Sequence, residues 1–190
     1  MPEIIDLYTK DREKTGITAV RGKRIPNNLY KLIVHVCIFN REGKMLIQQK
    51  ADQKNKANIW DFSAGGRAVA GENSAEAIRR ELKEEIGIDY DFTYIKPRLT
   101  VYFGKCFNDI YILKNLEPDL DSLTLQTEEV KAVKWATKKE ILELIDKKEF
   151  VRYDRSYIEF LFFMHRNGEG CIKNPRPSKK RTVKKSGSNS

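Results

Sequence analysis

Three glutamates with the spacing of one helix face lie near the middle of the chain: Glu81, Glu84 and Glu85. If residues 74–86 form a helix, the 100° step per residue places the three carboxylates within about 100° of arc. Like charges at this spacing repel one another on an exposed helix face. Hard oxygen ligands on neighbouring carboxylates suit Mg²⁺ or Mn²⁺, which would neutralise them. A solvated acidic face is the alternative interpretation.

The elements that must position these carboxylates are a helix and the glycine-rich segment before it. Asn73, with Glu76 three residues later, predicts a capping box that starts the helix, and Gly87 is well placed to end it. Apolar residues fall on the arc beside the glutamates, so one face can pack while the next gathers negative charge. These residues are Ala75, Ile78, Leu82 and Ile86.

A longer pattern runs from residue 66 to residue 88 and includes the three glutamates. Its nine defined positions are Gly66, Glu72, Arg80, Glu81, Leu82, Glu84, Glu85, Gly87 and Ile88. At every one of them the pattern resembles the signature box of the Nudix hydrolases, which is far more specific than a short glycine motif. The resemblance implies an α/β fold, a Nudix α/β/α sandwich with a mixed sheet. It also implies metal-dependent hydrolysis of a small-molecule diphosphate, with Mg²⁺ or Mn²⁺ as cofactor.

The resemblance also implies roles for single residues. Glu84 and Glu85 match the main metal ligands of the family, Glu81 a further ligand or orienting group, and the Gly66 carbonyl an additional ligand. A glutamate deprotonates the attacking water, and the sequence leaves open which one. Glu129 precedes a predicted strand, where family members often bring an acid to the metals. A solvated acidic pair at a strand start is the alternative for this residue.

Three further residues have expected roles around this site. Arg80 lies one turn before Glu84, so we expect it to pair with a carboxylate and hold it in place. Glu72 either anchors the loop to the helix or covers the helix N-terminus, where a carboxylate is favoured. Lys50 is a candidate to contact a substrate phosphate, with a solvated loop lysine as the alternative.

A second, weaker resemblance covers about residues 6–135 and concerns a branch related to isopentenyl-diphosphate isomerases. The segments LIVHVCIFN, GKMLIQQKA and NIWDFSAGG follow the layout of that branch. Isomerase chemistry needs a cysteine and histidines around the metal, but Gly65, Arg67 and Lys31 occupy those positions here. The intact box and the missing cysteine favour hydrolysis, and isomerase activity is the alternative.

The cysteines bear on both the chemistry and the compartment. Cys37, Cys106 and Cys171 are far apart, odd in number and not in CxxC pairs, so neither a disulfide framework nor a zinc site is expected. Cys37 or Cys106 would support isomerase chemistry only if the fold brought it to the metal. Reduced thiols indicate a cytoplasmic protein.

Length and charge indicate one domain followed by a basic tail. The chain has 190 residues, 40% of them hydrophobic, which fits a globular domain with its own core. Residues 173–190 hold seven basic side chains and no acidic one, so subtracting seven from the net charge of +9 leaves +2 on residues 1–172. We expect a Nudix domain over 1–172, with its core at 28–165, and a disordered tail. The balanced domain does not indicate a nucleic-acid binder, and an RNA-associated protein that uses the tail is a further alternative.

The remaining patterns exclude a membrane span and predict the other elements. The longest apolar run, Leu32 to Phe39, is too short to cross a membrane, and the first residues show no secretory signal. His35 within that run is more often a hydrogen-bonded core residue than a ligand. The oligomeric state is left open, a homodimer included.

The sequence also predicts the remaining secondary structure. Two strands, at 4–8 and 17–20, are expected to form an N-terminal hairpin, and further strands are expected at 32–40, 45–49, 68–70, 90–96, 99–104, 108–113 and 130–135. Residues 63–66 are expected to be flexible, and helices are expected from 138 to 145 and from 155 to 166.

Overall fold

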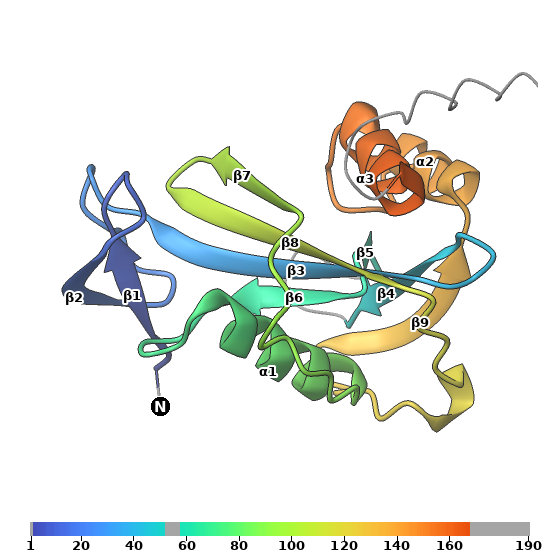
Figure 1. Ribbon diagram of the computed structural model, residues 1–190, viewed down its shortest axis with the longest axis horizontal. Coiled ribbons are helices and arrows are strands. Elements are labelled where there is room, and N and C mark those ends of the chain that lie inside the picture. Colours follow the sequence, from blue (N-terminus) through green and yellow to red (C-terminus); the bar gives the residue numbers. More distant parts are fainter. Residues whose placement is uncertain (1, 52–57, 168–190) are drawn as a thin grey trace, which may run out of the picture.

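The computed structural model describes residues 2–51 and 58–167 (Figure 1). The expected tail at 173–190 therefore lies outside the described residues, as does Cys171. The helices are α1 (Ser74–Ile86), α2 (Lys138–Asp146), α3 (Arg155–Asn167) and the short 3₁₀ turn η1 (Leu120–Ser122). The strands are β1 (Ile4–Tyr8), β2 (Lys14–Val20), β3 (Lys31–Phe39), β4 (Met45–Lys50), β5 (Trp60–Asp61), β6 (Ala64–Arg67), β7 (Leu99–Phe103), β8 (Cys106–Lys114) and β9 (Val130–Ala136).

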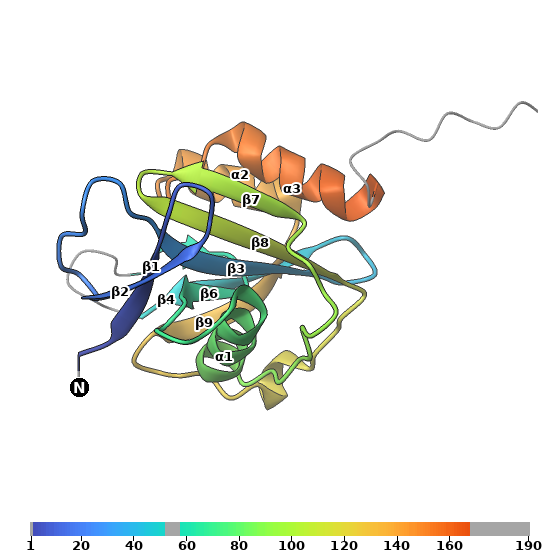
Figure 2. The same cartoon turned by 60° about the vertical axis from the view of Figure 1, so that its left-hand side comes forward.

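The main sheet is mixed and lies between helices. Its strand order is β5-β4-β3-β8-β7, with β6 also paired to β3 and β9 to β4. Strands β3 and β8 run parallel, and the other neighbours are antiparallel. Helix α1 covers one face while α2 and α3 cover the other (Figures 1 and 2). The predicted α/β/α sandwich with a mixed sheet and an N-terminal hairpin is confirmed. None of the helices in the described ranges is long and apolar enough to cross a membrane.

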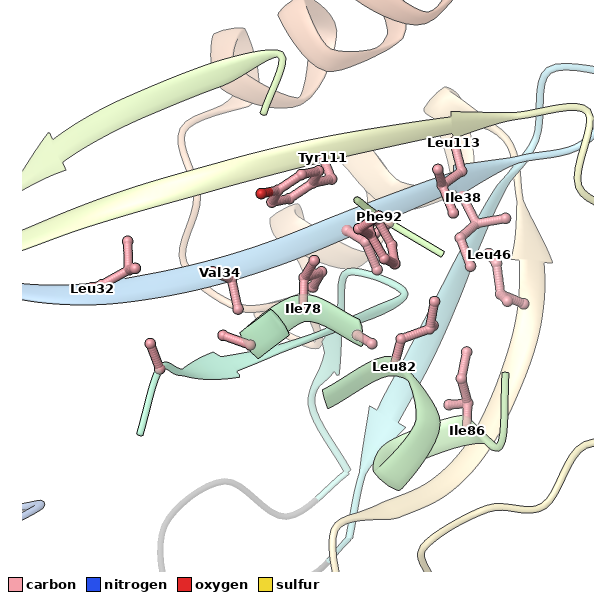
Figure 3. Close-up of a cluster of buried hydrophobic side chains, with 14 of the residues drawn as sticks. Leu32, Val34, Ile38, Leu46, Ile78, Leu82, Ile86, Phe92, Tyr111 and Leu113 are labelled. Atoms are coloured by element: carbon pink, nitrogen blue, oxygen red, sulfur yellow. The ribbon is translucent and has the colours of Figure 1, made fainter. Parts of the chain in front are cut away.

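Strand β3 contributes side chains to two separate cores because successive side chains point to opposite faces of the sheet. Leu32, Val34 and Ile38 pack in the core under α1, which Figure 3 shows together with the apolar face of the helix. Cys37 and Phe39 point the other way, into the core beneath α2 and α3. His35 and Ile33 share this second direction and line a cavity described below.

Helix α1 starts and ends where its sequence predicts. The Asn73 side chain accepts hydrogen bonds from the backbone N–H groups of Ala75 (2.9 Å) and Glu76 (3.1 Å). The Glu76 carboxylate accepts one from the Asn73 N–H at 2.8 Å, which completes the capping box. Gly87 ends the helix in the left-handed conformation at φ 77°. The caps fix where the helix begins and ends, while the contacts of its apolar face fix its rotation toward the sheet.

Three local predictions are wrong. Residues 90–96 form no strand, because Phe92 is buried against Tyr111 and the Ile95 N–H turns back to the Phe92 carbonyl at 3.0 Å. Residues 63–66 are not a flexible segment: Ala64–Arg67 is strand β6, antiparallel to β3, and no strand forms at 68–70. Glycine in β6 permits a close approach that a side chain would block.

Candidate active site

Strand β6 and helix α1 meet at one glycine and one glutamate. A Cβ atom on Gly66 would lie 2.2 Å from Oε1 of Glu81, far inside van der Waals contact. The absence of a side chain therefore lets the Glu81 carboxylate lie directly against the β6 backbone. Glu81 is 8% exposed, and burial raises the pKa of its carboxyl group.

Glu85 lies one turn further along α1 and is the most deeply buried of the three glutamates. It is 2% exposed, and its Oε2 accepts hydrogen bonds from the Gly65 N–H (2.8 Å) and from Nε2 of Gln48 (3.1 Å). Burial raises the pKa of Glu85 to about 7, although Lys50 and these hydrogen bonds act in the opposite direction. A buried carboxylate of this kind is best stabilised by a nearby cation.

Arg80 joins the acidic residues to the preceding loop. Its Nη1 lies 3.0 Å from both Glu81 Oε1 and Glu84 Oε2, and its Nε lies 2.6 Å from Glu72 Oε1. Glu72 also accepts a hydrogen bond from the Val69 N–H at 2.9 Å. Glu72 therefore ties the loop to α1 through Arg80, whereas the amides at the helix N-terminus are capped by Asn73.

The glutamates open into a cavity of about 420 Å³ beside β6 and the end of β4. Glu84, whose side chain is 53% exposed, lies at its open side. Every predicted site residue except Glu72, which lies behind Arg80, lines this cavity. They are Lys50, Gly66, Arg80, Glu81, Glu84, Glu85 and Glu129.

Lys50 is the last residue of β4 and is not a freely solvated loop lysine. Its side chain is 25% exposed, and Nζ lies 3.3 Å from Oδ2 of Asp61. Asp61 is itself buried on β5. The ammonium group is therefore held at the cavity wall by a neighbouring strand, where Glu85 and Glu129 also lie within electrostatic range.

The donor set fits a hard divalent cation, since carboxylate oxygens and a backbone carbonyl are the ligands that such ions prefer. No three His, Cys, Asp or Glu side chains within residues 2–51 and 58–167 form a ready-made metal cluster. Glu81 and Glu84 are paired with Arg80 instead. A cation held by these two carboxylates would replace or share contacts that the Arg80 guanidinium now makes.

A second cavity of about 680 Å³ adjoins the first. Four residues line both: Arg21, Lys50, Gly65 and Gly66. The second cavity is also bordered by aromatic rings, by the charged side chains of Asp61, Arg67, Arg152 and Asp154, and by a polar pair from the sheet. In this pair, His35 Nδ1 lies 2.8 Å from Asn108 Oδ1. The aromatic residues are Phe103, Tyr153 and Tyr157.

Several cavity residues were not expected from the sequence. Arg21 and Glu3 come from the N-terminal hairpin, and Gln126 comes from the connection after η1, where its N–H bonds the Glu85 carbonyl at 3.0 Å. None of the three belongs to a recognisable motif. They can be found only in the folded protein, because each is placed by contacts with residues that are distant in sequence.

The cysteines considered for isomerase chemistry do not reach the glutamates. Cys37 is fully buried in the core beneath α2 and α3, and burial raises the pKa of its thiol. Cys106 begins β8 and is also buried. Neither lines either of the two cavities.

Comparison with known proteins identifies the family of this chain. The model of the NUDIX domain matches residues 29–159. An uncharacterized Nudix hydrolase of Listeria innocua is 41% identical over 150 residues, which cover 78% of this chain and 88% of the relative. The CTP pyrophosphohydrolase of Escherichia coli is 32% identical over 58% of this chain and 78% of its own length. A crystal structure of a Deinococcus radiodurans protein shares the fold, with a TM-score of 0.68 over 84% of this chain and 99% of the other, at 22% identity. The chain therefore belongs to the Nudix family and is an enzyme of the hydrolase type that acts on small-molecule diphosphates.

Proposed function

We propose that this enzyme hydrolyses the diphosphate linkage of a nucleoside diphosphate derivative or a related small molecule, and that it depends on Mg²⁺ or Mn²⁺. The observation that supports this most strongly is the burial of Glu81 and Glu85 against the β6 backbone. Buried carboxylates at the edge of an open cavity are suited to holding a cation against an anionic substrate.

The ligands that we propose are all oxygen donors. Glu84 and Glu85 are the main ligands, Glu81 is a further ligand, and the Gly66 carbonyl is an additional one. Glu129 is the candidate from outside the helix, since it lines the same cavity. A divalent cation bound here would stabilise charge on phosphoryl oxygens and activate water.

The protein's own residues hold this arrangement in place. Arg80 orients Glu81 and Glu84, and Gln48 and the Gly65 N–H orient Glu85. The proton of the attacking water passes to one of the cavity glutamates. Hydrolysis of this kind depends mainly on positioning and charge stabilisation, so these fixed contacts are the main contribution of the fold.

The arrangement of the two cavities suggests how the substrate is oriented. Lys50 lines both of them, so we assign it to a phosphate oxygen at their junction. The organic group of the substrate then occupies the cavity with the aromatic rings, whose size is typical of small-molecule sites. The similarity to a CTP pyrophosphohydrolase supports a nucleoside as that group.

The isomerase alternative has less support. An isopentenyl-diphosphate isomerase of Halobacterium salinarum is 28% identical over 94 residues, which cover only 47% of this chain. Gly65 and Arg67 line the second cavity at the positions where the resemblance predicts a cysteine and a histidine. Neither residue can supply thiol or imidazole chemistry, so hydrolysis is the function that we propose. The cysteine usage also supports our inference of a cytoplasmic location.

The test is a panel of nucleoside diphosphates and triphosphates, dinucleotides, nucleotide sugars and isoprenoid diphosphates. Each is incubated with Mg²⁺, with Mn²⁺ and with excess EDTA, and products are identified by mass. We expect cleavage of a diphosphate linkage in the presence of a metal ion and none with EDTA. Double-bond migration in isopentenyl diphosphate, or no cleavage of any compound with either ion, would contradict the proposal.

A further inference from the structure

The N-terminal hairpin contributes side chains to the active site, although it lies outside the residues that match the family. Strand β2, the second strand of the hairpin, ends at Val20, and the NUDIX match begins at residue 29. Arg21, directly after β2, nevertheless lines both cavities. We propose that Arg21 binds the diphosphate of the substrate where the two cavities meet, an inference that rests on the proposed hydrolase function.

The position of Arg21 follows from the pairing of the hairpin. Its N–H donates to the Glu3 carbonyl at 2.9 Å, and its guanidinium forms an ion pair with the Glu3 carboxylate. Its side chain is 47% exposed and therefore open to a ligand. Because Glu3 lies within the same cavity, the pair holds the guanidinium toward the site when no diphosphate is present.

Two cations, Arg21 and Lys50, lie where the two cavities meet. Arg21 lies within electrostatic range of Glu81 and Glu129, and Lys50 within range of Glu85 and Glu129. Both cations therefore border the acidic end of the site, and both also border the second cavity. A diphosphate that spans the junction can contact both, and the planar guanidinium can bind two of its oxygens at once.

The hairpin is fixed to the domain by contacts that make this position reproducible. Tyr8 and Tyr30 exchange backbone hydrogen bonds of 2.8 and 2.9 Å, and the Ala70 N–H donates to the Ile4 carbonyl at 2.8 Å. At the far end of the hairpin, Arg12 pairs with the buried Asp109. Arg12 is thus a positioning residue: it contacts neither cavity but holds the hairpin that carries Arg21.

The experiment measures binding of methylenediphosphonate, a pyrophosphate analogue that cannot be hydrolysed, to the full-length protein with excess Mg²⁺. We expect calorimetry to show at least tenfold weaker binding for Arg21→Ala and an intermediate loss for Arg21→Lys, which keeps the charge. Lys23→Ala is the matched control, since Lys23 is an exposed cation two residues away that lines neither cavity. Arg12→Lys should raise KM for the best substrate of the panel while kcat stays near that of the wild type.

The outcomes separate this inference from the proposed function. Equal binding by Arg21→Ala and wild type, or no binding by wild type, overturns the role of Arg21, whatever the enzyme hydrolyses. If wild type binds the analogue, Arg21→Ala does not, and no diphosphate is cleaved, the hydrolase proposal fails while Arg21 remains a diphosphate-binding residue. Circular dichroism of each variant shows whether a loss of binding comes from unfolding.

Discussion

Arg12, in the turn of the N-terminal hairpin, forms a two-pronged ion pair with Asp109, in the middle of β8 and 97 positions away in the sequence. The Nη1–Oδ1 distance is 2.9 Å, and Nη2 contacts the second carboxylate oxygen. Asp109 is completely buried and also accepts hydrogen bonds from the hydroxyls of Thr100 (2.7 Å) and Ser74 (2.5 Å). One carboxylate thus connects the hairpin, β7 and the first residue of α1.

Replacing Arg12 should destabilise the protein strongly. Arg12→Met leaves the Asp109 carboxylate buried without its cation, which typically costs about 3–5 kcal/mol. Urea unfolding measures this loss. The double variant Arg12→Met/Asp109→Asn should recover part of it, because no charge is then buried. Lys10→Met, which removes an exposed cation of the same turn, should change stability by less than about 1 kcal/mol, and a similarly small effect of Arg12→Met would show that the pair is not stabilising.

Sequence alone could not predict this ion pair, because its two residues are far apart in the chain, whereas local patterns could be predicted. The spacing of Glu81, Glu84 and Glu85 and the capping box at Asn73 depend on neighbours within a few residues, so the helix and its acidic face were predictable. The glycines before it were predicted to be flexible, yet they form β6. Their lack of side chains serves a close contact with Glu81 that only the folded chain reveals.

The hairpin residues of the site were not predictable for the same reason. Arg21 lies two and three residues before other cations, Lys23 and Arg24, and nothing local distinguishes it. Its place at the cavity depends on the Tyr8–Tyr30 pairing, which joins the hairpin to the chain just before β3. Similarly, the aromatic pattern at 90–96 fits a strand until Phe92 is needed to fill the core under α1.

Neutralising Glu85 should remove activity without weakening the fold. Glu85→Gln keeps the shape of the side chain but removes the charge that we assign to metal binding, and we expect kcat to fall at least about a hundredfold. Stability should stay equal or rise, because an amide is less costly to bury than a carboxylate whose pKa is already raised. Steady-state kinetics and thermal unfolding of the same preparations test both statements.

The control for Glu85→Gln is Glu143→Gln, which removes a half-exposed carboxylate from α2, away from both cavities. We expect this variant to retain wild-type kinetics. Glu84→Gln should lose activity as well, with little effect on stability because its side chain is half-exposed. Retained activity in both Glu84→Gln and Glu85→Gln would contradict their assignment as ligands.

A single methyl group at Gly66 should disrupt the site. The Cβ atom of Gly66→Ala would lie 2.2–2.6 Å from the carboxylate atoms of Glu81, so the glutamate must move away or the β6 backbone must shift. We expect a loss of about 1–3 kcal/mol in the free energy of unfolding, as for other overpacked sites, and loss of measurable hydrolysis. Thermal unfolding and the diphosphate assay measure the two effects.

The double variant Gly66→Ala/Glu81→Ala distinguishes this clash from a general backbone effect. Removing the Glu81 carboxylate removes the atoms that the new methyl group would meet, so stability should return toward that of Glu81→Ala alone. Activity should remain absent, because a proposed ligand is missing. If the double variant is as unstable as the sum of the two single variants, the close contact between Gly66 and Glu81 is not the cause.

The two histidines should make the protein less stable as the pH falls below neutrality. Burial lowers the pKa of His35 and of His165 from the ordinary value of 6.5, so the unfolded chain binds protons at these sites before the folded protein does. Their contribution is complete above the unfolded pKa and is lost as the pH falls through that value toward the lower, folded pKa. Urea unfolding at about pH 7.5 and about pH 5.5 should therefore show a smaller decrease in the free energy of unfolding for His35→Gln than for wild type. The difference should approach about 1.4 kcal/mol per pH unit in the affected range.

The glutamine variant isolates the titration of this one imidazole. Glutamine can keep the hydrogen bond to Asn108 without titrating. Contributions of carboxylates such as Glu81 and Glu85, which act in the opposite direction, cancel in the comparison between variant and wild type. An unchanged pH dependence in His35→Gln would show that this imidazole is protonated equally in the folded and unfolded states.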